Sequence, residues 1–308
     1  MNAIETHGLS RRYGRLEAVH GLDLAVPAGA IFALLGPNGA GKSTTIKVLM
    51  NLLEPTAGSA TVLGVDSRRL SPRELARIGF VADNMELPEW MTVRVFLDYC
   101  RPLYPTWDRD LESNLLQKFE LPTDRKLKHL SRGMRMKAAL IAALAYRPML
   151  LVLDEPFSGL DPVVRDDFIR GVLEVSALGD WTVFLSSHDV EEVERLADWI
   201  AVLEQGKLRF AEPLDSLLRR FRRIEITRGA NSVPSPSQSQ KPIPSTWLAS
   251  EEAGTLHRFI DSQYMEGDAE RRCAELFPGA AINVQPLPLR EIYLTLARHP
   301  EAAKAMQP

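Results

Sequence analysis

A glycine-rich segment between an apolar stretch and a helical stretch places the tightest constraint on the fold. Ile31–Leu35 predicts a buried strand that runs into this segment, and a helix is expected to begin near Gly41. Glycines let consecutive backbone N–H groups converge on phosphate oxygens, and a helix N-terminus adds the positive end of its dipole. We therefore expect a strand–loop–helix unit that binds a nucleoside triphosphate. The segment fits G-x-x-x-x-G-K-[ST] and comprises Gly36, Pro37, Asn38, Gly39, Ala40, Gly41, Lys42, Ser43 and Thr44.

A second apolar stretch ends in two acids that suit the same chemistry. Met149–Leu153 predicts a buried strand that delivers Asp154 and Glu155 to the edge where open α/β sheets bind ligands. In this arrangement Lys42 reaches the β- and γ-phosphates, and Ser43 ligates Mg²⁺ through its hydroxyl. Asp154 holds the same Mg²⁺ through water, and Glu155 polarises the attacking water. The expected cofactors are ATP and Mg²⁺.

Short apolar runs alternate with longer segments of helical spacing, which indicates an α/β fold with a mostly parallel sheet. We predict a P-loop NTPase core of this kind. The opening, Ala3–Val26, alternates differently and predicts a small antiparallel β subdomain beside that sheet. The remaining expected strands are Ile78–Ala82 and Thr182–Ser186, and the expected helices are Thr44–Leu53, Met134–Ala145 and Val163–Leu173.

Composition along the chain divides it into three parts. Residues 1–228 are predicted to form the ATPase domain, and residues 84–145 form a helical insertion within it. Residues 229–246 are rich in proline and serine, which favours a flexible linker. Residues 247–308 mix short apolar pieces and predict a small α+β accessory domain.

Charge and hydropathy narrow the functional classes. The 308 residues include 37 Lys+Arg and 40 Asp+Glu, a net charge of −3 that argues against a dedicated nucleic-acid binder. Cys100 and Cys273 match no metal or redox spacing. Met1–Gly14 lacks the apolar core of a secretory signal, and no apolar run approaches the roughly 18 residues that cross a bilayer. We expect a cytoplasmic protein whose role at a membrane requires a membrane-spanning partner.

A third segment carries a family resemblance. Leu130–Met134 precedes the predicted helix that leads to the Asp154 strand, and it resembles the Leu-Ser-Gly-Gly-Gln signature of the ATP-binding cassette (ABC) ATPases. Ser131 and Gly133 match the signature, whereas Arg132 and Met134 depart from it. The motif places a helix N-terminus, a serine hydroxyl and glycine backbone against a γ-phosphate. In the family that phosphate belongs to the opposite subunit.

Further motifs follow in the order that this family has. His188 closes the strand Thr182–Ser186, and the resemblance makes it the switch histidine that hydrogen-bonds the γ-phosphate and orients the water. Asp83 stands where the family usually has the glutamine that links Mg²⁺ and water to the transport partner. Tyr13 resembles the aromatic residue that stacks on adenine. The D-loop comprises Ser158, Gly159, Leu160 and Asp161.

The resemblance covers about Asn2–Phe221 and implies a mechanism. The chain resembles the ATP-binding and ATP-hydrolysing subunit of an ABC transporter, and Tyr104–Asp108 and Leu289–Tyr293 resemble the separate-subunit ATPases of bacterial antibiotic, multidrug and bacteriocin exporters. Two such subunits, identical or different, sandwich two ATPs, and hydrolysis lets the dimer reopen. The motion drives an integral membrane subunit, so the chain is expected at the inner face of the cell membrane.

Two other functions remain open at this stage. A regulatory or nucleic-acid-directed ABC ATPase has the same motifs and no transport partner. A P-loop kinase has the phosphate loop and transfers phosphate to a small molecule, but that function leaves Ser131 and His188 unexplained.

Overall fold

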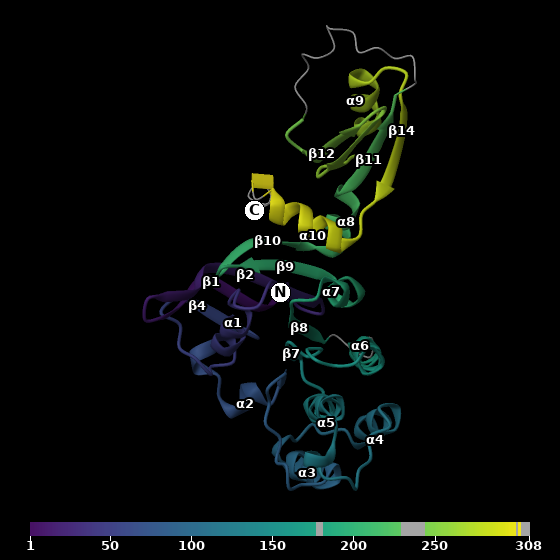
Figure 1. The fold of residues 1–308 in the computed structure, drawn as a ribbon. Helices are drawn as coiled ribbons and strands as arrows, with labels where there is room; N and C mark the ends of the chain where they lie inside the picture. The colour runs from purple at the N-terminus through teal and green to yellow at the C-terminus, as the bar shows by residue number, and fades with distance from the viewer. Residues whose placement is uncertain (177–180, 229–243, 300, 303–308) are drawn as a thin grey trace. The chain divides into compact units, whose positions relative to one another are not determined.

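The computed structural model describes residues 1–176, 181–228, 244–299 and 301–302 (Figure 1). The chain forms two compact units, Met1–Ala211 and Glu212–Pro308. No helix in these described ranges is long and apolar enough to cross a lipid bilayer.

A six-stranded sheet forms the centre of the first unit. Its strands are β3 (Ile31–Leu35), β6 (Ile78–Ala82), β7 (Leu150–Asp154), β8 (Thr182–Ser187), β9 (Trp199–Glu204) and β10 (Lys207–Pro213), in the order β10-β9-β3-β8-β7-β6. β3 pairs in parallel with β8 and β9, and β7 with β6 and β8. Gln205 and Gly206 alone connect β9 to β10, so this edge pair is antiparallel. The predicted mostly parallel sheet is confirmed.

Helices connect the central strands, and the carboxyl ends of these strands lie at one edge of the sheet. Every residue of β3, β7 and β8 is buried, as expected of parallel strands with both faces covered. The helices are α1 (Lys42–Leu49) after β3, α2 (Pro72–Leu75) before β6, α6 (Pro162–Ser176) after β7 and α7 (Val190–Leu196) after β8. The phosphate loop, Asp83, Asp154 and His188 all lie just at or beyond these strand ends.

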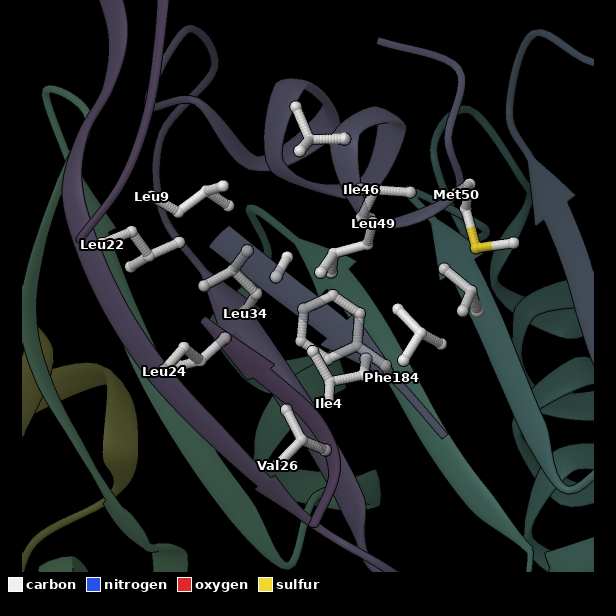
Figure 2. Close-up of a cluster of buried hydrophobic side chains, with 14 of the residues drawn as sticks. Ile4, Leu9, Leu22, Leu24, Val26, Leu34, Ile46, Leu49, Met50 and Phe184 are labelled. Atoms are coloured by element: carbon white, nitrogen blue, oxygen red, sulfur yellow. The ribbon is translucent and has the colours of Figure 1, made fainter. Parts of the chain in front are cut away.

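The N-terminal part forms an antiparallel sheet that packs over α1 and the central sheet. Its strands are β1 (Asn2–Tyr13), β2 (Leu16–Pro27), β4 (Ala57–Val62) and β5 (Val65–Asp66), in the order β2-β1-β4-β5, and a 3-10 turn (Ser67–Arg69) follows. The predicted antiparallel β subdomain is confirmed, and β4 and β5 extend its sheet beyond Ala3–Val26. Figure 2 shows the core that results, with buried side chains that include Ile4, Leu9, Leu22, Leu34, Ile46, Leu49 and Phe184.

The predicted helical insertion lies between β6 and β7. It contains α3 (Val93–Cys100), α4 (Arg109–Lys118), α5 (Arg132–Leu144) and 3-10 turns at Arg101–Leu103 and Leu127–His129. Side-chain oxygens start each helix: Thr92 accepts a hydrogen bond from the backbone N–H of Val95, Asp108 from that of Leu111, and Ser131 from that of Met134. α5 packs against α3, α4, α6 and β6, and so ties the insertion to the sheet.

The described residues of the second unit form a four-stranded antiparallel sheet with three helices. The strands β11 (Arg222–Thr227), β12 (Trp247–Ala253), β13 (Leu256–Asp261) and β14 (Ala281–Pro286) follow the order β12-β13-β11-β14, and the helices are α8 (Leu214–Arg220), α9 (Asp268–Leu276) and α10 (Leu289–Arg298). Its small core contains Trp247 stacked on Phe259, with ring centroids 3.9 Å apart, beside the buried Cys273.

The structure divides the chain between Ala211 and Glu212, whereas the sequence predicts the division after residue 228. The difference arises because β11 pairs along its whole length with β13 and β14, which come later in the chain. The accessory domain therefore includes β11, and also α8. Most of the predicted linker, residues 229–243, lies outside the described residues.

Candidate nucleotide site

The phosphate loop turns between β3 and α1 with its backbone pressed against neighbouring segments. A Cβ at Gly36 would lie 2.1 Å from the carbonyl oxygen of Leu203. A Cβ at Gly41 would lie 2.3 Å from the carbonyl oxygen of Ala18, and Gly41 also has φ +106°. Only glycine fits these two positions. At Gly39, with φ +82°, the space where a Cβ would point is open, which suits close approach of a ligand. The loop therefore has the shape that phosphate binding needs.

Lys42 turns back over this loop from the first residue of α1. Its ammonium donates to the carbonyl oxygens of Gly36 at 2.6 Å and of Pro37 at 3.1 Å. It also lies 2.9 Å from Oε1 of Glu155, and its side chain is only 4% exposed. A buried ammonium needs such partners. A phosphate oxygen over the loop would compete with Glu155 for this cation.

Asp154 and Ser43 form an oxygen-lined position beside the loop. The hydroxyl of Ser43 donates to Oδ1 of Asp154 at 2.9 Å, and Asp154 is buried. Hydroxyl and carboxylate oxygens suit Mg²⁺, which keeps several waters and takes its other ligands from phosphate. Within the described ranges, no three acidic, histidine or cysteine side chains gather to hold a metal by themselves. The pair thus fits a Mg²⁺ ion that is bound together with a nucleotide.

Glu155 links Lys42 to His188. Its Oε2 lies 2.7 Å from Nδ1 of His188, while its Oε1 faces Lys42. Glu155 has φ +50°, in the left-handed region that non-glycine residues seldom adopt, so the chain turns sharply as β7 ends. The turn directs the carboxylate towards the phosphate loop, where it is able to accept a proton from water. His188 is 44% exposed, which leaves its ring open to a ligand or a partner.

The signature segment and the D-loop form one surface. Gly133 sits so close to α6 that a Cβ there would lie 2.5 Å from Cγ1 of Val164. Asp161 caps α6 by accepting a hydrogen bond from the backbone N–H of Val164 at 3.0 Å. Ser131 starts α5, and Ser158 and Leu160 donate backbone N–H groups within the turn between β7 and α6. Met134 continues α5 after Gly133.

Asp83 lies at the end of β6, next to Asp154 in the sheet. Its backbone N–H donates to the carbonyl oxygen of Asp154 at 3.0 Å, and its carboxylate forms an ion pair with Arg132. In the sequence, Asp83 and Arg132 are two separate departures from the family pattern. The structure brings them together.

Tyr13 is the last residue of β1. Its ring is partly exposed, and the guanidinium carbon of Arg11 lies 4.8 Å from the ring centroid. Ala40 forms backbone hydrogen bonds within and beyond the phosphate loop. Its N–H donates to the carbonyl oxygen of Pro37 at 3.1 Å, and its carbonyl oxygen accepts from the N–H of Gly206 at 2.9 Å. Stacking of Tyr13 on adenine stays a prediction.

Sequence reasoning missed Ser186, the fully buried residue that organises the two acids. Its hydroxyl donates to Oδ1 of Asp154 at 2.7 Å and accepts from the backbone N–H of Glu155 at 3.0 Å. The available signal was a serine pair, Ser186 and Ser187, directly after the apolar residues Val183–Leu185 of the same strand. A buried hydroxyl in such a strand indicates a specific partner.

We expect Ser186→Ala to lower ATP turnover about tenfold, because Asp154 loses one buried hydrogen-bond donor worth roughly 1–3 kcal/mol. Thr182→Val at the opposite end of β8 is the matched control, since it removes one buried hydroxyl that accepts from the N–H of Gly29. It should reduce thermal stability without a specific loss of turnover. Steady-state hydrolysis and thermal unfolding of both variants test this role. Equal effects of the two variants on turnover would contradict it.

The central parallel sheet, the glycine-lined loop and the acids beside Lys42 define a P-loop ATPase. A family model described as ABC transporter matches residues 19–158. The daunorubicin/doxorubicin resistance ATP-binding protein DrrA of Streptomyces peucetius is 34% identical over 318 residues, which cover 97% of this chain and 93% of that protein. The chain belongs to the ABC transporter family, as one of its ATP-hydrolysing subunits.

Two further comparisons agree. The Nod factor export ATP-binding protein I of Rhizobium leguminosarum bv. viciae is 37% identical over 212 residues, which cover 67% of each chain. A solved ATP-binding subunit of an ABC transporter is 29% identical, with a TM-score of 0.64, and the match covers 70% of this chain and 92% of that one. The predicted family and fold class are confirmed.

Proposed function

We propose that this chain powers an exporter by ATP-driven closure and reopening of a dimer at the inner face of the cell membrane. The observation that carries the proposal is the match along 97% of the chain to a drug-resistance ATP-binding protein, which includes the accessory unit as well as the ATPase unit. Its 37% identity to an export ATP-binding protein over 67% of the chain supports the same function.

Each nucleotide is bound by the phosphate loop of one subunit and by Ser131 and Gly133 of the other. Ser43 and Asp154 would hold Mg²⁺, which would supply the positive charge that neutralises the phosphate oxygens. Lys42 exchanges its contact with Glu155 for phosphate oxygens, which leaves Glu155 free to take a proton from water. His188 keeps Glu155 oriented. The 2.9 Å and 2.7 Å contacts of the Glu155 carboxylate support this sequence of events.

The membrane subunit docks on the cleft between the end of β6 and the helical insertion. A cavity of about 450 Å³ lies there, lined by Asp83, Met85, Leu87, Arg135 and Met136, among others. Nearby on the insertion, the large side chains of Trp90 and Tyr99 are 69% and 60% exposed. Exposed aromatic groups beside a cavity with both polar and apolar lining are typical of a protein contact.

Membrane association tests the proposal. Because the described residues hold no spanning helix, the chain should sediment with membranes only when its partner is co-expressed. Trp90→Glu combined with Tyr99→Glu should abolish this association and preserve ATP binding. Leu16→Glu, at an exposed position on the N-terminal hairpin, is the matched control and should sediment as wild type does. Failure to co-sediment with any co-expressed membrane subunit, or turnover stimulated by nucleic acid instead, would contradict the proposal.

A further inference from the structure

Two departures from the family's motifs are partners of one another. Arg132 replaces the first glycine of the signature, and Asp83 replaces a glutamine 49 residues earlier in the chain. Nη2 of Arg132 donates to Oδ1 of Asp83 in a close ion pair. The exposed fractions of the two side chains are 44% and 27%, so the pair is only partly screened by solvent.

Arg132 also packs directly on the D-loop. A Cβ at Gly159 would lie 2.3 Å from Nη1 of Arg132 and 2.9 Å from its guanidinium carbon. Gly159 has φ +66°, so glycine is favoured there for its backbone as well. The guanidinium of Arg132 therefore contacts the carboxylate of Asp83 and also lies against Gly159 of the D-loop.

Asp83 continues the connection towards the nucleotide. Its backbone N–H donates to the carbonyl oxygen of Asp154 at 3.0 Å, where β6 and β7 end side by side. Asp154 in turn contacts Ser43. Three motifs that are distant in sequence thus meet through one arginine: the signature, the D-loop and the end of β6 beside the magnesium-binding acid.

The position of Arg132 explains why it requires an anion. It is the first residue of α5, where the positive end of the helix dipole disfavours a cation. The first turn of α5 contains no acidic residue. Asp83 supplies the missing negative charge from another element, and the ion pair also fixes the direction in which the start of α5 points.

We propose that Asp83 and Arg132 act as one positioning unit, in place of the family's glutamine and glycine, that holds the signature end of α5 in register with the nucleotide site. Neither residue touches the reacting atoms in this role. Loss of either partner leaves α5 and the D-loop free to shift, so the composite site closes less often in the productive geometry. Nucleotide binding by Lys42 and Ser43 in the same chain is unaffected.

A double-mutant cycle tests the proposal on the full chain. The variants are Asp83→Gln, Arg132→Gly and the pair together, with kcat and KM for ATP measured at low and high salt. Each single change should lower kcat about tenfold with KM within about twofold of wild type, whereas the double change should lose far less than the roughly hundredfold product of the two. Wild-type kcat should also fall more steeply with salt than that of the double variant.

The exposed pair Arg195–Asp166 of α7 and α6 is the matched control. Alanine changes at these two positions should leave kcat unchanged. ATP binding and thermal unfolding of each variant distinguish a positioning role from loss of the fold, because an unfolded variant loses ATP affinity and shows no cooperative unfolding transition. Losses in kcat that multiply in the double variant, or single changes that raise KM and spare kcat, would overturn the proposal. ATP-dependent dimer formation by the wild-type chain is measured separately from turnover. A test that contradicts the shared-site mechanism is therefore distinguished from one that contradicts the positioning role of Asp83 and Arg132.

Discussion

Glu155→Gln is expected to lower ATP turnover about a hundredfold or more, the lower end of what a positioned general base contributes. The amide keeps nearly the same shape but takes up no proton from water. ATP binding should persist, because Lys42, Ser43 and the loop amides are unchanged. Affinity should even rise, since the ammonium of Lys42 no longer has a carboxylate at 2.9 Å that competes with phosphate.

The same variant is expected to accumulate an ATP-bound dimer, because hydrolysis is the step that reopens the shared site. Sedimentation with and without ATP measures this directly. Lys42→Ala is the control: it weakens triphosphate binding, because the cation over the loop is lost, and should give no such dimer. A Glu155→Gln protein that remains monomeric at saturating ATP, even with its partner present, would rule out the shared-site mechanism.

Mixing two inactive variants is expected to restore a dimer that neither forms alone. In a Glu155→Gln background, Lys42→Ala disables the phosphate loop, and Ser131→Arg blocks the signature with a bulky side chain at the start of α5. In a two-fold symmetric pair of chains, each site takes its loop from one chain and its signature from the other. A mixed dimer therefore contains one site with an intact phosphate loop and an intact signature, and one site in which both are disabled.

The decisive comparison is between each variant alone and the equimolar mixture at the same total concentration with ATP. Because neither variant pairs with itself, every monomer remains available to pair with the other variant, so most of the material should sediment as dimer if one intact site is sufficient for closure. Each Ser131→Arg chain should still bind ATP, which shows that its fold is intact. A mixture as monomeric as its components would place the signature's contribution within its own chain and contradict the model.

Local motifs could be located from the amino-acid sequence because each one is contiguous. The phosphate loop needs Gly36, Gly41 and Lys42 at set spacings between a strand and a helix, and no distant residue is required to recognise that pattern. The strands Ile31–Leu35 and Ile78–Ala82 were predicted with the bounds that the structure has. Every residue of Ile31–Leu35 is buried, and in Ile78–Ala82 all but Phe80 are buried, so each strand gives an apolar run that is visible in the sequence.

The accessory unit shows where this reasoning fails. The boundary predicted after residue 228 places β11 in the ATPase domain, because β11 precedes the proline- and serine-rich stretch. Its partners, β13 and β14, lie on the other side of that stretch. Strand pairing depends on hydrogen bonds between segments that are distant in the chain. The composition shows where the proline- and serine-rich stretch lies, but it does not show whether a strand before that stretch pairs with strands before it or after it.

The amino-acid sequence was sufficient for the kind of fold, the family and the identity of the acids, loop and signature, since these depend on residue type at short spacing. Only the tertiary structure revealed Ser186 between Asp154 and Glu155, the Lys42–Glu155–His188 series and the Asp83–Arg132 pair. Each of these contacts joins the ends of different strands or helices. Their existence depends on strand order and register, which bring carboxyl ends to one edge from positions tens of residues apart.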